Sequence, residues 1–357
     1  MKTIFHNKRI SGLLSVLPQT VVKFENEINN YTFPPKQTLR LQKVMGFKQH
    51  RIVKENTATS DLCIAGLQYI LDNNWLKKEE IGGIVVACSY PDYFMPSVST
   101  IIHGKFELSE EVFCIDISQV CTGFLMALNE GFMLLDHIAD KKVLVFAADV
   151  LSKLVSKKDR NSYPLIGDAA GIAVLENCEA ESDIYSIVYN SGVMRNALKV
   201  PAGGSRLAPN RETAELKDFE NDGNLRSLNN LTMQGADVFT FVQTKVPPVI
   251  KEILEFANID KSEIERFLLH QPNKFMLKKL AEKIGVPYDK IPMNIVEEFG
   301  NSSGACIPVC ATYNIADLLI RENKKYCLAA FGAGFTWGAT ILDIGNLDFC
   351  EMLISDC

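Results

Sequence analysis

The chain has 357 residues and a formal charge of −6, from 37 Lys and Arg against 43 Asp and Glu. This mild acidity leaves no broad basic face, which argues against a nucleic-acid-binding protein. With 47% apolar and 22% charged residues, the composition is that of a folded globular protein and excludes disorder as the main state.

The chain shows no signature of export or of a membrane anchor. Its longest apolar runs are far shorter than the roughly 20 residues of a spanning helix. Lys8 and Arg9 interrupt the N-terminal segment before a signal-peptide core can form. We therefore expect a cytoplasmic protein without a membrane partner. Because export is not expected, we interpret the ten cysteines as reduced thiols, and since they include no CxxC pair we expect no metal and no thioredoxin-type site.

The first half predicts alternating helices and strands. From Leu67, the segment LQYILDNNWLKKEEIGGIVVACS reads as an amphipathic helix, an acidic turn and an apolar strand. A second strand, VFCIDIS, ends near Ser118. The helix that follows is apolar on nearly all sides from Phe124 to Ile138, which indicates burial on every face. The run KKVLVFAADV predicts a third strand.

The second half repeats this order at one constant offset along the chain. The segment PVIKEILEFANIDKSEIERFLLHQP aligns with the segment from Leu67, with Ile264 over Ile81. The same offset places KKYCLAAFGAG over KKVLVFAADV, and Gly304 in NSSGACIPV over Cys121. Each half is therefore expected to carry the order helix–strand–strand–helix–strand. Three matches at one gap-free offset indicate an internal duplication.

The duplicated strands are continuous in Val, Ile and Leu, which is typical of parallel strands covered on both faces. An α/β unit duplicated around a buried helix predicts a five-layer αβαβα sandwich. We expect an N-terminal half at 1–178 and a C-terminal half at 179–357. Residues 191–230 contain PAGG, APN, NDG and SLNN, which are turn sequences. They predict either a lid over a binding site or a surface insertion without a role.

Three polar side chains stand at the ends of predicted elements. Cys121 precedes the buried helix, whose N–H groups and dipole favour a thiolate and a lowered pKa; a buried structural cysteine is the alternative. His270 ends the apolar strand FLL, where α/β proteins place ligands, although a structural histidine fits as well. Asn301 lies in the turn FGNSSGACIP, which favours Asn on geometry alone. A thiol with two polar partners favours covalent acyl chemistry. The turn FGAGFTWG offers backbone N–H groups for an oxyanion.

The segments SQVCTGF, LIGDAAGIAVL, LLHQPN, FGNSSGACIP and AAFGAGFTWGA carry a family resemblance. From about Ile10 to Ile344 the chain resembles β-ketoacyl-acyl-carrier-protein synthase III, of the thiolase superfamily. The resemblance implies the duplicated five-layer fold and a homodimer. It also implies an acyltransferase activity, decarboxylative Claisen condensation, in which an acyl group on Cys121 joins malonyl-acyl-carrier-protein to give a 3-oxoacyl product. The implied partners are acyl carrier protein and acyl and malonyl thioesters, with no cofactor.

The resemblance also implies roles for single residues. Cys121 would be the nucleophile, and His270 and Asn301 would assist decarboxylation of the malonyl thioester. The backbone N–H groups of Cys121 and Ala333 would form the oxyanion hole. Four residues would line the substrate and pantetheine path, the last as a gate donated across the dimer interface: Arg160, Phe239, Asn273 and Met95. Apart from the resemblance, the helix after HQPN carries two i,i+4 rows of lysines along one side, which predict either a docking face for an acidic carrier protein or a plain solvated face: Lys274, Lys278, Lys279 and Lys283.

The chain departs from the family at several places. The family usually clamps the adenine of coenzyme A with Trp and Arg, where this chain has Arg40 and Val44. We therefore predict that the starter arrives on a carrier protein. Ala is usual in the family at Gly304, and the segment after Ile344 has no assigned counterpart. The alternatives are an acyltransferase or a non-decarboxylating condensing enzyme of the same fold, or a non-catalytic partner subunit.

Overall fold

Two β-sheets form the frame of the molecule. The computed structural model describes residues 1–138, 140–179 and 182–357. The strands of these sheets are β1 (Lys2–Phe5), β2 (Lys8–Pro18), β5 (Ile81–Cys88), β6 (Phe113–Ser118), β7 (Lys142–Asp149), β8 (Ala169–Asn177), β9 (Ile184–Asn190), β12 (Arg266–Leu269), β13 (Lys324–Gly332), β14 (Thr336–Ile344) and β15 (Phe349–Ser355). The first sheet has the order β15-β2-β8-β7-β5-β6, and the second has the order β1-β9-β14-β13-β12. Every residue of β5 is buried, as expected for a strand covered on both faces.

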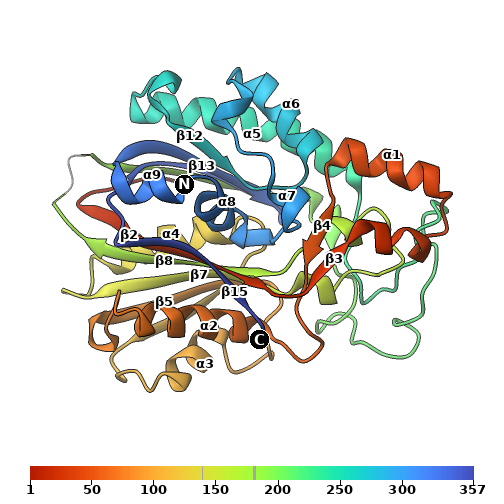
Figure 1. Cartoon of the computed structure of the whole chain (residues 1–357), viewed down its shortest axis with the longest axis horizontal. Helices are drawn as coiled ribbons and strands as arrows, with labels where there is room; N and C mark the ends of the chain where they lie inside the picture. Colours follow the sequence, from red (N-terminus) through yellow and green to blue (C-terminus); the bar gives the residue numbers. More distant parts are fainter. Residues whose placement is uncertain (139, 180–181) are drawn as a thin grey trace.

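Helices form the other three layers (Figure 1). Between the sheets lie α4 (Gly123–Leu134) and α8 (Cys306–Asn314), which share one apolar core with the strands on either side. Two helices cover the outer face of each sheet: α2 (Thr59–Asp72) and α3 (Val98–Lys105) on the first, α5 (Gly235–Ala257) and α6 (Lys274–Ile284) on the second. The predicted five-layer αβαβα sandwich is confirmed.

The internal repeat is visible in the elements themselves. The 3₁₀ turns Lys78–Glu80 and Lys261–Glu263 are related by the offset of the sequence repeat and lead into β5 and β12. These strands pair in parallel with β7 and β13, which are also related by the repeat.

One predicted strand is missing from the second half. Within the described residues, the place of β6 is taken by α7 (Ile295–Glu298) and a single bridge between Ile166 and Asn301. The predicted strand order therefore holds only in the first half. The physical reason lies at Gly300, whose φ of 85° turns the chain. A Cβ on Gly300 would stand 2.7 Å from the backbone nitrogen of Gly167. The backbones of these two glycines are therefore in contact at the position where a strand equivalent to β6 would end.

Each end of the chain joins the sheet built mainly by the other half. β1 pairs with β9 in the second sheet, and β15 runs parallel to β2 at the edge of the first. The segment after Ile344, which had no assigned counterpart, thus covers an otherwise unpaired strand edge. The division at residues 178 and 179 falls between β8 and β9 and remains a prediction. The terminal strands do not follow it.

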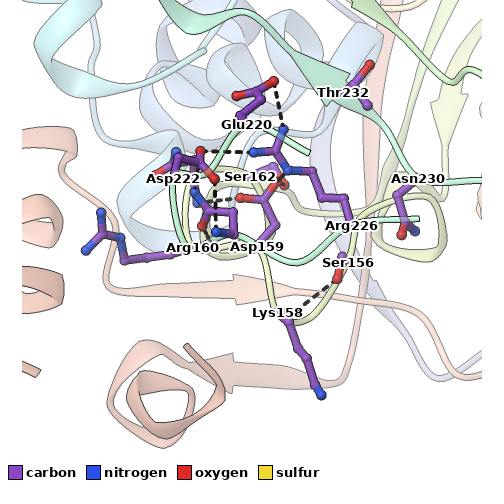
Figure 2. A network of polar contacts seen from close by, with 12 residues as sticks. Ser156, Lys158, Asp159, Arg160, Ser162, Glu220, Asp222, Arg226, Asn230 and Thr232 are labelled. Atoms are coloured by element: carbon purple, nitrogen blue, oxygen red, sulfur yellow. Dashed lines mark hydrogen bonds and ion pairs between the residues drawn. The ribbon is translucent and has the colours of Figure 1, made fainter. Parts of the chain in front are cut away.

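Buried charges fasten the segment 191–230 to the first half (Figure 2). Arg226 is 5% exposed and lies 3.3 Å from Asp159 and 3.1 Å from Asp222. The Asn224 side chain accepts a hydrogen bond from the backbone N–H of Arg160 at 2.9 Å. Removing one partner of a buried ion pair leaves an uncompensated charge, so these contacts hold the segment in place. Its role as a lid remains a prediction.

Small elements complete the chain. No helix in the described ranges is long and apolar enough to cross a membrane. The small elements are β3 (Val21–Lys23), α1 (Pro35–Met45), β4 (Gln49–Arg51), β10 (Leu198–Lys199), β11 (Thr232–Met233) and α9 (Ala316–Arg321).

Candidate active site

Cys121 lies on the turn between β6 and α4, directly before the helix N-cap Thr122. The turn from β13 to β14 packs against it. A Cβ on Gly332 would stand 2.9 Å from Cys121 Sγ, so a glycine is needed there to leave room for the thiol. The predicted lowering of the pKa is wrong. Burial raises the pKa of the Cys121 thiol, the neighbouring Cys306 and Asp149 raise it further, and the backbone N–H of Cys121 opposes them only in part.

His270 follows β12 and is 2% exposed. Its backbone N–H donates to the carbonyl of Ala329 at 2.8 Å, which extends the pairing of β12 with β13. Its ring meets the Phe331 ring edge-on, with the centroids 5.4 Å apart. Burial lowers the pKa of the imidazole to about 3, and a backbone hydrogen bond at Ser303 opposes this in part. The ring is therefore neutral at neutral pH with a single N–H, which a ligand would have to take from the Ser303 carbonyl.

Asn301 is held by backbone and side-chain contacts. Its N–H donates to the carbonyl of Leu165 at 2.6 Å, and its carbonyl accepts from the N–H of Gly167 at 3.0 Å. Its Oδ1 accepts from the N–H of Ser303 at 3.0 Å and from the Cys306 thiol at 3.2 Å. Both donors approach the oxygen, which orients the carboxamide. Its Nδ2 donates to no group in the part of the chain that the structure describes, and it is free for a ligand.

The two repeats meet at this place. A Cβ on Gly304 would lie 3.6 Å from the Cα of Gly123, so α4 and α8 begin against each other. Cys306 contacts Asn301 and raises the pKa of the Cys121 thiol, while Ser303 contacts both Asn301 and the His270 ring. The structure thus brings Cys121, His270 and Asn301 to one place. Their catalytic roles remain predictions.

The predicted oxyanion hole lies on two adjacent turns. Ala333 follows Gly332 in the turn from β13 to β14, which packs on Cys121. Within the described residues, neither Cys121 nor Ala333 donates its N–H to a backbone or side-chain oxygen. Neither N–H is therefore taken by another oxygen, as an oxyanion hole requires, although the Cys121 N–H also lies within reach of its own Sγ.

The four predicted substrate-binding residues have different surroundings. The Arg160 guanidinium lies over the Phe33 ring, 3.3 Å from its centroid, and burial lowers its pKa. Phe239 on α5 stacks with the Phe275 ring, their centroids 5.7 Å apart.

The other two are a helix cap and an exposed tip. The Asn273 side chain accepts from the N–H of Met276 at 2.8 Å and so caps α6. Met95 is 82% exposed, beside Phe94, which is 91% exposed. All four assignments as substrate-binding residues remain predictions.

The four lysines of α6 do not form one basic face. Lys274 pairs with Glu297 at 3.0 Å, and Lys279 pairs with Glu282 at 2.8 Å. Lys283 donates to the carbonyl of Gln243 on α5 at 3.0 Å. Among the described residues, Lys278 has no carboxylate partner, and with Lys274 and Arg266 it lines a hollow of about 440 Å³. The role of these lysines in docking remains a prediction.

Sequence reasoning missed three groups of this site. Ser303 and Cys306, which orient Asn301, lie in the quoted turn FGNSSGACIP but carry no recognisable pattern of their own. Asp149 is 2% exposed at the end of β7, and an acid directly after a fully apolar run was a signal that could have marked it. The described residues hold no cluster of three or more His, Cys, Asp or Glu that could bind a metal ion.

Comparisons with known proteins point to one family. The family model for 3-oxoacyl-[acyl-carrier-protein (ACP)] synthase III matches residues 115–192, and the model for its C-terminal part matches 254–344. The chain is 31% identical to the β-ketoacyl-[acyl-carrier-protein] synthase III of Clostridioides difficile over 83% of this chain and 87% of that protein.

Two further relatives match the whole chain. A Campylobacter jejuni protein, provisionally named as a 3-oxoacyl-[acyl-carrier-protein] synthase 3, is 29% identical over 99% of both chains. The crystal structure of a 3-oxoacyl-(acyl-carrier protein) synthase from Burkholderia xenovorans superposes with a TM-score of 0.90 and 28% identity, again over 99% of both chains. With these matches beside the motifs and the fold, the chain belongs to the β-ketoacyl-[acyl-carrier-protein] synthase III family of condensing enzymes.

Proposed function

We propose that the protein catalyses the decarboxylative condensation of an acyl group on Cys121 with malonyl-acyl-carrier-protein. The observation that carries this proposal is the orientation of Asn301. Its oxygen is taken by Ser303 and Cys306, so only its NH₂ group can meet a ligand. A site with a free carboxamide donor beside a neutral imidazole suits negative charge that develops on a thioester oxygen.

In the first step, Cys121 Sγ attacks the carbonyl carbon of an acyl thioester. The C–S bond of the donor breaks, and its thiolate leaves as a thiol with the proton that Cys121 gives up. The free N–H groups of Cys121 and Ala333 stabilise the oxyanion. Because burial raises the pKa of the thiol, this proton must be removed as the attack proceeds.

In the second step, the malonyl thioester loses carbon dioxide. The electron pair of the broken C–C bond passes to the thioester as an enolate, whose oxygen accepts hydrogen bonds from His270 and Asn301. The enolate carbon then attacks the acyl carbonyl and expels the Cys121 thiolate, which takes a proton from solvent. No proton has to leave the imidazole in this step, which agrees with its depressed pKa.

The test uses the intact protein and a panel of acyl thioesters. Mass spectrometry should find one acyl adduct, localised to Cys121, and release of labelled carbon dioxide should follow when malonyl-carrier protein is added. Acylation without carbon dioxide release would favour a plain acyltransferase or a non-decarboxylating enzyme. No adduct with any donor would favour a non-catalytic partner subunit.

We further propose that the starter acyl group arrives on a carrier protein. In addition to the missing clamp at Arg40 and Val44, the Phe33 ring already covers one face of the Arg160 guanidinium at 3.3 Å. That face is no longer open for an adenine to stack on, and such stacking contacts are worth roughly 1–3 kcal/mol.

The donor proposal is tested with one acyl group on two carriers. Cys121 should be acylated faster from the carrier protein than from coenzyme A, and Phe33→Ala should narrow the difference by uncovering Arg160. Phe219→Ala is the control, because this ring is 49% exposed within the segment 191–230. Faster acylation of the unmodified protein from coenzyme A would reject the proposal.

We also propose a homodimer in which the tip at Phe94 and Met95 enters the partner's acyl site. Both side chains are more than four-fifths exposed, which is unusual for large apolar groups. β6 also forms an open edge of the first sheet, with Phe113 48% exposed. A monomer in sedimentation would reject the interface, and an unchanged chain-length preference in Met95→Trp would reject the gate.

A further inference from the structure

Four hydrogen-bond donors converge on one buried carboxylate near Cys121. Asp149 Oδ1 accepts from the Ser89 N–H and the Ser89 hydroxyl, both at 2.8 Å, and from the Tyr90 N–H at 3.3 Å. Its Oδ2 accepts from the Ser303 hydroxyl at 2.8 Å. Asp149 belongs to the first sheet, whereas Ser303 belongs to the turn before α8 in the second half. The mechanism above gives Asp149 no role and uses only the backbone N–H of Ser303.

Ser303 is the link between this carboxylate and the proposed decarboxylation pair. Its backbone N–H donates to Asn301 Oδ1 at 3.0 Å, and its backbone also contacts the His270 ring. It is 1% exposed and has a φ of 56°, the left-handed region that serine rarely adopts. Such a conformation persists only when its surroundings fix it, and the bond from its hydroxyl to Asp149 is the side-chain contact that does so.

We propose that Asp149 and Ser303 form a positioning pair for decarboxylation, in which the bond between them aims the Asn301 carboxamide and the His270 ring at the enolate oxygen. This inference rests on the proposed function. Neither residue needs to touch the substrate. A displacement of the Ser303 turn would move both donors together, and errors of about 1 Å in such groups cost up to about 100-fold in rate.

The chemistry of the pair explains why a carboxylate stands there. An ionised carboxylate only accepts hydrogen bonds, so it can meet all four donors at once. Burial raises the pKa of Asp149 to about 6, while the hydrogen bonds from Ser89, Ser303 and Tyr90 oppose that rise, so the ionised form prevails at neutral pH. In Asp149→Asn the oxygen can stay with Ser89 and Tyr90, and the new NH₂ can donate to the Ser303 hydroxyl, which also accepts.

The neighbouring serine provides a matched control. Ser302 is also 1% exposed, and its hydroxyl contacts the Cys306 Sγ at 3.7 Å instead of Asp149. Ser303→Ala and Ser302→Ala therefore delete the same group from adjacent buried positions. Thermal unfolding of each variant shows how much of the sample is folded, and rates are expressed per folded molecule.

The experiment measures acylation of Cys121 and malonyl decarboxylation separately in each variant. In Ser303→Ala, kcat for decarboxylation should fall about 10- to 100-fold with little change in KM, because the hydroxyl positions donors and does not bind substrate. Acylation should stay within about twofold of the unmodified protein, and Ser302→Ala, whose hydroxyl reaches Asn301 only through the Cys306 thiol, should lose less decarboxylation than Ser303→Ala. The decarboxylation rate should fall less in Asp149→Asn than in Ser303→Ala. In the double variant it should fall no further than in Ser303→Ala alone.

Two results would overturn the pair. One is a Ser303→Ala protein that decarboxylates as fast as Ser302→Ala. The other is an equal loss of acylation and decarboxylation, which would indicate a general structural role. If instead the unmodified protein releases no carbon dioxide from the malonyl thioester, the proposed function itself fails, and that failure is visible before any variant is compared.

Discussion

The turn before α4 and the turn before α8 occupy equivalent places in the two halves, yet only one presents a candidate nucleophile. At the offset of the internal repeat, Cys121 corresponds to Gly304 and Gly123 to Cys306. Each helix thus has one cysteine and one glycine, in opposite order. Cys121 is half-buried, while Cys306 is 1% exposed and holds Asn301 Oδ1 at 3.2 Å.

This difference shows that a helix N-terminus does not by itself lower the pKa of a thiol. Burial raises the pKa of both thiols, to about 11 for Cys306. The two thiols differ in exposure and in their neighbours: Cys121 is half-buried against the turn at Gly332, whereas Cys306 is buried and donates to a carboxamide oxygen.

The largest expected effect comes from replacing each of these two cysteines separately with alanine. Cys121→Ala should abolish acylation and reduce condensation by at least about 10,000-fold, because the neighbouring Cys306 thiol is buried and donates to Asn301. Cys306→Ala should still be acylated but should condense about threefold to tenfold more slowly, because Asn301 loses one of its two orienting donors. Mass spectrometry after incubation with an acyl thioester separates the two results. An acyl adduct on Cys306 in the unmodified protein would reverse the assignment.

The second largest effect is expected from His270 and Asn301, which contact Ser303 in the turn before α8. His270→Ala and Asn301→Ala should keep acylation of Cys121 but lose about 100- to 1,000-fold in malonyl decarboxylation, since each removes one oxyanion donor. Asn314→Ala, at the other end of α8, is the matched control. Wild-type condensation in both site variants would refute the roles. Loss of acylation in His270→Ala would instead make His270 the base for Cys121.

Much of this site follows from sequence patterns, and the rest depends on packing. The constant offset between the repeats predicts that the turns at Cys121 and Asn301 are equivalent, and periodicity predicts the buried helix between them. The loss of the β6 equivalent could not be predicted, because it depends on Gly300 touching Gly167. Such backbone contacts join residues far apart in the chain and leave no local pattern.

Electrostatic properties were the least predictable part. The helix position of Cys121 suggests a lowered pKa, but desolvation depends on the surrounding core and outweighs the dipole. In the same way, two of the predicted docking lysines, Lys274 and Lys279, have carboxylate partners that only the folded structure reveals. Charge counts along one helix do not report the charges that pack beside it.

The third prediction uses pH to measure how deeply the site is buried. Burial lowers the pKa of His270 from 6.5 to about 3 in the folded protein. The unfolded chain therefore binds the proton first as pH falls, so this contribution to stability is complete above pH 6.5 and is lost between pH 6.5 and 3.

His270→Gln removes the titrating group at a similar size. Its free energy of unfolding should fall less steeply below pH 6.5 than that of the unmodified protein, as followed by urea unfolding at several pH values. Asp149 acts in the opposite direction between pH 3.8 and about 6, because burial raises its pKa. Asp149 is present in both proteins, so the comparison isolates His270.

His137→Gln, which removes an exposed imidazole, is the control. Identical slopes in His270→Gln and the unmodified protein would contradict the burial of an uncharged ring.

A fourth change tests how closely the two helices approach. A methyl group on Gly304 would stand 2.9 Å from the carbonyl oxygen of Val120, a backbone atom that cannot rotate away. Gly304→Ala should therefore push α8 from the Cys121 turn and lower the free energy of unfolding by about 1–3 kcal/mol. In Gly123→Ala the new methyl group would stand 3.0 Å from the methyl group of Ala87, and the free energy of unfolding should fall less than in Gly304→Ala. Equal stability of Gly304→Ala and the unmodified protein in urea would show that the contact is looser.

The smallest effect is expected on the outer helices. Here α3 and α6 can be compared, because they follow the equivalent strands β5 and β12. α6 alone carries four lysines, and among the described residues Lys278 is exposed without a carboxylate partner, while Lys279 pairs with Glu282 at 2.8 Å. An acidic carrier protein should respond to the unpaired charge. Lys278→Glu should therefore slow transfer from the carrier protein by about threefold to tenfold at low salt, while Lys279→Glu has a smaller effect. The difference should shrink at high salt, where Coulomb attraction is screened, and transfer from coenzyme A should not change. Equal slowing with both donors would place Lys278 in the binding of the shared pantetheine arm, and no slowing with either would remove α6 from the docking surface.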